Sequence, residues 1–344
     1  MDRREELKYF QSMPLDIKVA MTQTRIREWI NYYGMSGTYI SFSGGKDSTV
    51  LLHLVRELYP DIEAVFVNTG LEYPEIQSFA KSFENVTVLN PRMPFNEVIK
   101  TYGYPFISKE VSHVIYEGKR WTEETRKYQY RLDRLNGIGN YSCKKYKPLL
   151  YVDFNLSHLC CNVMKKSPAK KYEHSSGKVP ILGTLAEESR LRQSEWVKNG
   201  CNAFDSKRPR SAPMSFWTEN DVLKYIHDND LKIAPVYGDV KLQADRQLSF
   251  DDLQDLDGEE CKYATTGCDR TGCIYCGFGA HLDKYSRFLR LKETHPKQYH
   301  YCIDGGEYDI DGVWKPNQKG LGIGHVIDKL NELYSKNGKA FIEY

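Results

Sequence analysis

The sequence has almost no excess charge of either sign and no long apolar run. Its 48 Lys and Arg residues are balanced by 46 Asp and Glu residues, so the formal net charge is +2. This balance excludes a polycation that would coat nucleic acid through net charge alone. No stretch approaches the roughly 18 apolar residues of a membrane span, and the first ten residues, MDRREELKYF, carry charges instead of an apolar signal core. We therefore expect a soluble, cytoplasmic protein without a membrane partner.

The composition also lacks the marks of a disordered or disulfide-rich chain. Hydrophobic residues make up 40% and charged residues 27% of the 344 residues, which permits a large buried core. The length allows one or two domains, and we expect one elaborated domain. The nine cysteines are an odd number, and five of them form two tight groups. This pattern favours reduced thiols for a metal or for catalysis over disulfides.

Hydrophobic patterning predicts alternating helices and strands. Residues 16–33 have apolar side chains at three- and four-residue spacing, which is typical of an amphipathic helix. Residues 218–228 have the pattern of a capped helix. Short strand-like segments lie at residues 39–42, 64–67, 86–89 and 178–184. Strands that alternate with helices are typical of an α/β fold, a parallel sheet with helices on both faces.

A glycine loop follows the first predicted strand and precedes a helical segment. The loop consists of Ser43, Gly44, Gly45, Lys46, Asp47 and Ser48. The glycines let the backbone approach an anion, the helix N-terminus offers N–H groups, Lys46 adds a positive charge, and the serines supply hydroxyl donors. Asp47 would repel a phosphate unless Mg²⁺ lies between them. The loop therefore predicts a binding site for a Mg²⁺-bound polyphosphate; a tight turn that simply needs glycine is the alternative.

This S-G-G-K-D-S sequence after a strand resembles the signature of the PP-loop nucleotide enzymes. The chain is similar to their phosphoadenosine phosphosulfate reductase-like branch, particularly the versions of bacteriophages and mobile elements, from about residue 36 to about residue 300. The resemblance implies an adenine nucleotide alpha hydrolase-like (HUP-type) fold that binds ATP or a related adenine nucleotide. It implies catalytic roles for Lys46 and Asp47 and nucleotide binding by the whole loop.

Two further segments carry the resemblance. Asn68-Thr69-Gly70-Leu71-Glu72-Tyr73-Pro74-Glu75 is similar to the family's D-T-G-x-x-F-P-E, which implies nucleotide contacts for Thr69 and Gly70. The segment from residue 183 to 192 is similar to G-x-R-x-x-E-S-x-x-R. The matching residues are Gly183, Glu188 and Ser189, implied in nucleotide binding, and Arg192, implied in catalysis. Glu188 and Arg192 could also form an ordinary helix-surface ion pair.

One position departs from the reductase pattern. Leu185 stands where a reductase has an arginine for the phosphosulfate anion. An apolar side chain there leaves a desolvated anion without its charged partner. In addition, the sequence contains no E-C-G-[IL]-H, the segment that carries the nucleophilic cysteine of thiol-dependent reductases in the family. Both departures weaken the reductase interpretation.

Paired cysteines and a later C-x-x-C resemble the ligands of a [4Fe–4S] cluster in the assimilatory adenylylsulfate reductases. By this resemblance the ligands are Cys160, Cys161, Cys273 and Cys276. The family also places a lysine near the cluster, four residues after the second paired cysteine, and Lys165 has that position here.

A different set of four thiols remains open. Cys261 and Cys268, together with Cys273 and Cys276, lie within sixteen residues and resemble the cysteine-rich segment of the DNA phosphorothioation sulfurtransferases. Such a set could hold zinc. A chain that binds no metal is the third alternative.

Lysines gather in one stretch of the sequence, Lys144 to Lys178. Eight lysines and two acids, with tyrosines between them, could line a path for an anionic polymer such as nucleic acid. The stretch could equally be a solvated face. It falls within the part from about residue 100 to 178 that we interpret as an insertion.

These observations predict three segments: residues 1–35, helical; residues 36–245, the nucleotide-binding α/β domain with its lysine-rich insertion; and residues 246–344, a C-terminal segment with cysteines that folds back on the domain. The first functional hypothesis is an enzyme that cleaves Mg–ATP between the α- and β-phosphates and adenylates an acceptor for sulfur transfer, with a sulfur donor protein as a further partner. The alternatives are a phosphoadenosine or adenosine phosphosulfate reductase, and a non-catalytic nucleotide-binding accessory protein of a defence or mobile-element system.

Overall fold

The computed structural model describes residues 2–120, 126–139, 141–243 and 262–344. The chain forms two compact units where the sequence suggested one elaborated domain. The first unit comprises Met1–Asn68, Glu72–Asn90 and Ala169–Thr271, and the second comprises Thr69–Leu71, Pro91–Pro168 and Gly272–Tyr344. Most of the expected insertion therefore belongs to the second unit. The expected boundary between residues 245 and 246 lies outside the described residues, so the three predicted segments stay a prediction.

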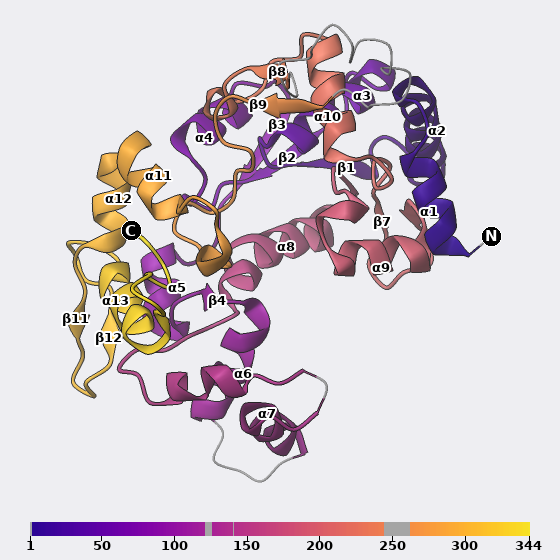
Figure 1. Ribbon diagram of the computed structural model, residues 1–344. Helices are drawn as coiled ribbons and strands as arrows, with labels where there is room; N and C mark the ends of the chain where they lie inside the picture. Colours follow the sequence, from indigo (N-terminus) through magenta and orange to yellow (C-terminus); the bar gives the residue numbers. More distant parts are fainter. Residues whose placement is uncertain (1, 121–125, 140, 244–261) are drawn as a thin grey trace, which may run out of the picture. The chain divides into compact units, whose positions relative to one another are not determined.

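A six-stranded, mostly parallel sheet organises the first unit (Figure 1). Its strand order is β3-β2-β1-β5-β7-β6. The strands are β1 (Thr38–Phe42), β2 (Ala64–Val67), β3 (Val86–Leu89), β5 (Val179–Leu182), β6 (Asn202–Ala203) and β7 (Arg210–Ser211). β1 lies between β2 and β5, and Ile40 pairs in register with Ala64 on one side and Ile181 on the other. β6 alone among these strands runs antiparallel to its neighbour. The predicted α/β class with a parallel sheet is confirmed.

Helices pack around this sheet because each has a buried apolar side. The helices of the first unit are α1 (Arg3–Gln11), α2 (Leu15–Tyr33), α3 (Lys46–Leu58), α4 (Pro74–Lys81), α9 (Arg190–Asn199) and α10 (Glu219–Asp228). α3 packs against β1, and α2 and α10 contact α3. α10 begins where the sequence predicts, since the Thr218 hydroxyl accepts from Asp221 N and the Asp221 carboxylate accepts from Thr218 N. A hairpin of β8 (Val240–Leu242) and β9 (Tyr263–Thr265) completes the described part of this unit.

The second unit is mainly helical, with short strand pairs. Its helices are α5 (Phe95–Tyr102), α6 (Lys109–Arg120), α7 (Arg126–Asn136), α11 (Arg287–Thr294), α12 (Pro296–Ile303) and α13 (Ile323–Tyr334). β4 (Phe106–Ile107) pairs in parallel with β10 (Gly277–Phe278). A Cβ on Gly277 would lie 2.4 Å from the ring of the buried Phe106, so only glycine fits at this crossing.

One helical segment passes from the second unit into the first. Residues 160 and 161 begin it, the π-helix Asn162–Lys166 follows, and α8 (Ser167–Ser176) continues it. Of the helices that the structure describes, none combines the length and the apolar character needed to cross a bilayer.

Candidate functional site

The glycine loop lies at the carboxyl end of β1, where the chain turns into α3. Gly44 has φ +73°, and a Cβ there would lie 3.0 Å from both Ile76 Cγ2 and Ile76 O. The turn therefore requires glycine. The hydroxyls of Ser43 and Ser48 lie 3.0 Å apart, and Ser48 Oγ donates to Gly45 O at 2.9 Å. These bonds hold the loop against the first turn of α3, whose N–H groups and dipole favour an anion.

Lys46 is the first residue of α3 and is buried, with 4% of its surface exposed. Its Nζ lies 3.2 Å from Asp47 Oδ1 and 3.0 Å from Glu219 Oε1. Burial lowers the pKa of Lys46, but the two carboxylates outweigh it, and the net result is a raised pKa. The ammonium group is therefore charged at neutral pH.

A cavity of about 300 Å³ opens beside the loop, and we call it the loop cavity. It is lined by Ser41, Ser43, Gly45, Lys46, Asp47, Ser48, Leu182, Gly183, Thr184, Glu188, Arg192, Tyr237, Arg270 and Thr271. Gly183 lets the end of β5 approach the loop, because a Cβ there would lie 3.0 Å from Asp47 O and 3.1 Å from Ser48 Cα. The sequence segments around residues 43 and 183, which the family resemblance had linked, thus meet at one cavity.

Several residues of this site carry no sequence motif and were missed. The Tyr237 hydroxyl accepts from Lys46 N at 3.2 Å and lies 2.5 Å from Thr271 Oγ1. Arg270 Nη2 donates to Glu188 Oε1 at 2.9 Å. Glu219, the carboxylate that pairs with Lys46, lies more than 170 residues from it in sequence. Each is an isolated residue, so spacing gave no signal for them.

Glu188, Ser189 and Arg192 lie at the start of α9. Glu188 pairs with Arg192 and with Arg270, so one carboxylate is shared by two guanidinium groups. Burial and the repulsion of Arg270 lower the pKa of Arg192. Ser189 caps α9 by accepting from Arg192 N at 3.3 Å. The ion pair foreseen from the i, i+4 spacing is present, and it forms part of the cavity wall.

Thr69 and Gly70 belong to the second unit. Thr69 Oγ1 accepts from Leu71 N at 3.2 Å, Gly70 has φ +72°, and Leu71 O accepts from Ile274 N at 2.8 Å. The latter bond joins this turn to the segment that contains Cys273 and Cys276. Nucleotide contacts of Thr69 and Gly70 stay a prediction.

The second unit also contains the paired cysteines and the C-x-x-C. Burial and the negative charges of Cys161, Cys273 and Cys276 raise the pKa of the Cys160 thiol, while Lys165 opposes them. The four thiols and Lys165 thus belong to the same unit. Nevertheless, the described part of the chain has no three His, Cys, Asp or Glu side chains already arranged to hold a metal ion. The cluster thus remains a prediction.

The alternative set of cysteines is divided between the two units, because Cys268 belongs to the first unit and Cys273 and Cys276 belong to the second. Cys268 is buried in the first unit, where its N–H donates to Val236 O at 3.0 Å. Cys261 lies outside the described residues. The structure therefore leaves this quartet as a prediction too.

The lysine-rich stretch is divided between the two units. Lys178 pairs with Glu63 at 2.6 Å, and the Lys145 ammonium lies over the rings of Tyr146 and Phe341, each at 5.3 Å. Some of these lysines thus have partners within the chain, and nucleic-acid binding stays a prediction.

A mostly parallel sheet with a glycine loop between its central strand β1 and the helix α3 defines an α/β protein. The model of the phosphoadenosine phosphosulfate reductase domain family matches residues 37–127 and 122–277. The chain belongs to this family. The phage or mobile-element type stays a prediction.

Individual relatives are distant. An uncharacterized protein of Methanocaldococcus jannaschii is 25% identical over 80% of this chain and 50% of its own length. A phosphoadenosine 5'-phosphosulfate reductase of Xanthomonas axonopodis pv. citri is 23% identical over 61% of this chain and 69% of its own. An adenosine 5'-phosphosulfate reductase of Bacillus cereus is 21% identical over 57% of this chain and 65% of its own length. The chain thus spans from half to about two thirds of the length of these relatives.

Among solved structures, phosphoadenylyl-sulfate reductase from Candida auris, in a phosphate complex, aligns with a TM-score of 0.37 and 12% identity. The alignment covers 65% of this chain and 91% of that chain.

Proposed function

We propose that this protein binds Mg–ATP in the loop cavity, cleaves it between the α- and β-phosphates, and adenylates an acceptor for sulfur transfer. The observation that carries the proposal is that Lys46 of the glycine loop is buried and charged while position 185 holds an uncharged leucine. Lys46 favours a polyphosphate, whereas Leu185, with 2% of its surface exposed, offers no charge to a phosphosulfate group.

Several residues of the loop cavity have a role in this reaction. The glycine loop and the first turn of α3 bind the β- and γ-phosphates. An oxygen of the acceptor bonds to the α-phosphorus while the bond to the pyrophosphate oxygen breaks. Pyrophosphate leaves with the electron pair, and a proton of the acceptor is released to water. Lys46 stabilises the charge that develops on this leaving group, and Arg192, which also lines the cavity, stabilises the α-phosphate.

Mg²⁺ is part of the proposal because of the charges at the loop. Asp47 lines the cavity and would repel a polyphosphate unless a cation lay between them. Asp47 would therefore hold the ion, and the bound ion would neutralise part of the phosphate charge.

A [4Fe–4S] cluster fits the chemistry of the neighbouring thiols in the second unit. Four cysteines form the usual donor set of such a cluster, and cationic iron would offset the burial and the mutual repulsion that raise the pKa of Cys160. Cys160, Cys161, Cys273 and Cys276 would be the ligands, with Lys165 beside them. When bound, the cluster would bind or relay the sulfur that a donor protein delivers.

Calorimetry with two nucleotides tests the substrate. Mg–ATP should bind at least as tightly as phosphoadenosine phosphosulfate, because the guanidinium that would pair with the sulfonate is missing, and such a charged bond contributes about 1.5–3 kcal/mol. A clear preference of the wild type for the sulfonucleotide would reject the ATP assignment.

A sulfonucleotide reductase is the second candidate. The names of the relatives favour it, since both the Xanthomonas and the Bacillus proteins are sulfonucleotide reductases. This function predicts release of sulfite from phosphoadenosine or adenosine phosphosulfate when a thiol reductant is supplied. The proposed function predicts no sulfite, but release of pyrophosphate from ATP in the presence of the acceptor.

A further inference from the structure

Three hydroxyl groups surround Gly45 of the glycine loop. A Cβ on Gly45 would lie 3.3 Å from Ser43 Oγ and from the Tyr237 hydroxyl. It would lie 3.7 Å from Thr271 Oγ1. All four residues line the loop cavity, but Tyr237 and Thr271 come from segments of the first unit that are distant from the loop in sequence. A phosphate bound at the loop would therefore lie within reach of side chains that belong to no loop motif.

The serines of the glycine loop use their hydroxyl protons within the loop. Ser48 Oγ donates to Gly45 O at 2.9 Å. In the bond of 3.0 Å between Ser43 Oγ and Ser48 Oγ, the donor is therefore Ser43. A hydroxyl has one proton, so each serine would have to give up an internal bond before it could donate to a phosphate. A further hydroxyl donor for the ligand has to come from another part of the cavity wall.

Tyr237 is the middle member of a chain of hydrogen bonds. Its hydroxyl accepts from Lys46 N at 3.2 Å and lies 2.5 Å from Thr271 Oγ1. Tyr237 is 2% exposed and burial raises its pKa, so the phenol keeps its proton at neutral pH and needs an acceptor for it. In the described part of the chain Thr271 is that acceptor, because the other partner of Tyr237 is an N–H donor. The chain therefore runs from Lys46 N–H through Tyr237 O–H to Thr271.

Thr271 ends this chain with its own proton unused. It is half-buried and lines the loop cavity, and its bond to Tyr237 is the hydrogen bond that its hydroxyl makes among the described residues. Because hydrogen bonds in a chain polarise one another, the Thr271 O–H is a stronger donor than that of an isolated threonine. An oxygen of an anion is the acceptor that gains most from such a donor.

Backbone contacts hold the segment that leads to Thr271 against the segment of Tyr237. Gly267 N donates to Tyr237 O at 2.8 Å, and Cys268 N donates to Val236 O at 3.0 Å. A Cβ on Gly267 would lie 2.4 Å from Val236 O, so this close approach requires glycine. The two hydroxyls of Tyr237 and Thr271 are thus brought together by the fold before a ligand binds.

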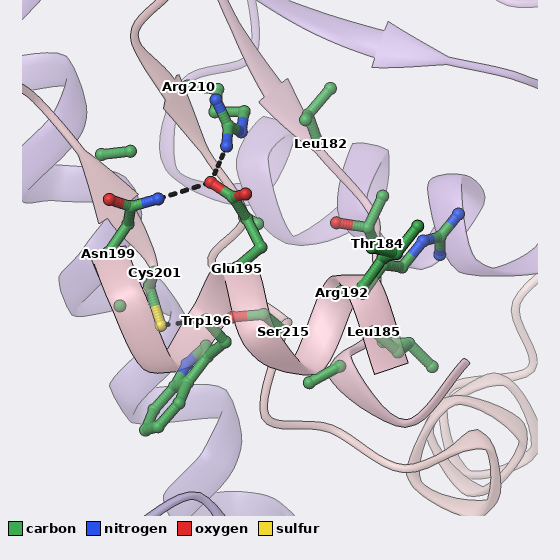
Figure 2. Close-up of a pocket in the computed structure, with 15 residues that line it drawn as sticks. Leu182, Thr184, Leu185, Arg192, Glu195, Trp196, Asn199, Cys201, Arg210 and Ser215 are labelled. Atoms are coloured by element: carbon green, nitrogen blue, oxygen red, sulfur yellow. Dashed lines mark hydrogen bonds and ion pairs between the residues drawn. The ribbon is translucent and has the colours of Figure 1, made fainter. Parts of the chain in front are cut away.

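The neighbouring Arg270 ties the same segment to the start of α9. Arg270 Nη2 donates to Glu188 Oε1 at 2.9 Å, and Glu188 also pairs with Arg192. Figure 2 shows Arg192 on the first turn of α9, beside Thr184, which follows β5. Thr271 is therefore held by two sets of contacts. A donor that is already in place loses less conformational entropy when the ligand binds.

From this chain of contacts we infer that Thr271 binds the ligand of the loop cavity by donating its hydroxyl proton to a phosphate oxygen, and that Tyr237 is a positioning residue that orients this proton. The inference rests on the proposed function for a polyphosphate in the loop cavity, but not for the adenylation of an acceptor. It adds a second segment of the first unit, distant in sequence, to the anion site.

Calorimetry with the Mg²⁺ complexes of pyrophosphate and of ATP tests the role of Thr271. Thr271→Val keeps the shape of the side chain, and the affinity for both ligands should fall about tenfold or more, because a hydrogen bond to a charged group is lost. Thr271→Ser restores the hydroxyl and should bind within about threefold of the wild type. Thr265→Val removes a threonine hydroxyl that donates to Cys268 O outside the cavity lining, and it should leave both affinities unchanged.

A double-mutant cycle tests the role of Tyr237. Tyr237→Phe should weaken binding of Mg–pyrophosphate about 3- to 10-fold in the wild-type background and no further in the Thr271→Val background, because Tyr237 acts through Thr271. An equal loss in both backgrounds would show a structural effect of the ring and overturn the positioning role. Tighter binding in Tyr237→Phe would also overturn it, since the tyrosine would then block Lys46 N from the ligand.

The two ligands separate this inference from the proposed function. Wild-type affinity of Thr271→Val for both ligands would reject the inference alone. Binding of Mg–pyrophosphate with the expected loss in Thr271→Val, but no binding of Mg–ATP, would reject the proposed function and support the inference. If the wild type bound neither ligand, both would be rejected.

Discussion

Lys46 is buried and charged at the same time, which an isolated lysine avoids because desolvation disfavours the ammonium form. Its two carboxylate partners make this arrangement stable. One of them, Glu219, lies at the first position of α10, where the helix dipole also favours a negative charge. A polyphosphate that enters the loop cavity would replace part of this pairing, so Lys46 is held charged and in position before the ligand arrives.

We expect Lys46→Met to abolish Mg–ATP binding and to destabilise the protein by about 2–4 kcal/mol, because it leaves Asp47 and Glu219 unpaired. The double variant Lys46→Met/Glu219→Gln removes both sides of one pair and should regain part of the stability while still failing to bind Mg–ATP. Chemical denaturation and calorimetry measure the two effects. Nucleotide affinity within about threefold of the wild type in the double variant would contradict the role of Lys46.

Gly183 is the second residue on which the loop cavity depends. In Gly183→Ala, the new Cβ would press on Asp47 O and Ser48 Cα, which are backbone atoms that cannot move aside cheaply. We expect a loss of about 1–3 kcal/mol of stability and clearly weaker Mg–ATP binding. Gly139→Ala is a control for the added methyl group, because a Cβ there meets nothing within 4 Å. Its φ of +90° adds backbone strain of its own. Unchanged Mg–ATP binding in Gly183→Ala would show that the contact between β5 and the loop does not shape the site.

Among the elements, the helical segment that starts at residue 160 places the paired cysteines. Its second part, Asn162–Lys166, is a π-helix, a rare form that often marks functional sites. Lys165 lies in this π-helix, and its positive charge opposes the rise that burial causes in the pKa of the Cys160 thiol. The role of Lys165 beside a cluster stays a prediction.

Iron analysis of single variants separates the two cysteine quartets. If Cys160 is a ligand, Cys160→Ser should lose most of the iron of the anaerobically purified protein, and its unfolding temperature should fall by at least about 4 °C, because metal binding stabilises the fold. Cys261→Ser and Cys268→Ser are the matched controls and should keep their iron. Full iron in Cys160→Ser, with loss in Cys261→Ser, would show that the local quartet holds the metal.

α6 carries a half-buried lysine, Lys119, with an unusual pKa. Lys119 Nζ donates to Val152 O at 2.9 Å and to Phe154 O at 2.7 Å, and burial lowers its pKa from 10.5 to about 8. Below pH 8 the ammonium is protonated in both states, so the burial penalty is present in full. Between about pH 8 and 10.5 the unfolded state binds more protons than the folded state, so the stability contributed by Lys119 rises with pH.

We therefore expect the difference in unfolding free energy, wild type minus Lys119→Met, to increase between pH 7.5 and pH 9.5. Taking the difference removes the titration of tyrosines and cysteines that both proteins share. Urea denaturation at several pH values measures it. A difference that stays flat or falls over this range would show that Lys119 is not buried in its charged form.

Local patterns were enough to predict several elements. The helix expected at 16–33 is α2, the strands at 39–42, 64–67 and 86–89 are β1, β2 and β3, and the capped helix at 218–228 is α10. Their signals lie within a few residues: periodicity, β-branched residues and a capping threonine. The glycine loop was predictable for the same reason.

Contacts between distant segments were not predictable. Tyr237 and Arg270 line the loop cavity, and Glu219 pairs with Lys46, each through a single side chain, and no periodicity marks a single residue. The order of the strands depends on which helix packs on which face of the sheet. That choice is made by packing over the whole core rather than by any local segment.

The whole molecule consists of two units, and each is built from segments that are far apart in the sequence. The loop cavity lies in the first unit, and the four proposed cluster ligands lie in the second. A ligand stabilises the folded state to which it binds. The two proposed ligands should therefore protect different parts of the chain.

Hydrogen exchange of the anaerobically purified protein tests this separation. Mg–ATP at 100 times its Kd stabilises its unit by about 2.7 kcal/mol, so amides around residues 42–49 and 182–192 should exchange up to about 100-fold more slowly. Residues 159–166 and 273–276 should respond to removal of iron by a chelator instead, with faster exchange. Slower exchange at residue 71 with Mg–ATP would support the predicted contacts of Thr69 and Gly70, which belong to the second unit. If Mg–ATP protected the cysteine segments and left the glycine loop unchanged, the nucleotide site would have to be reassigned to the second unit.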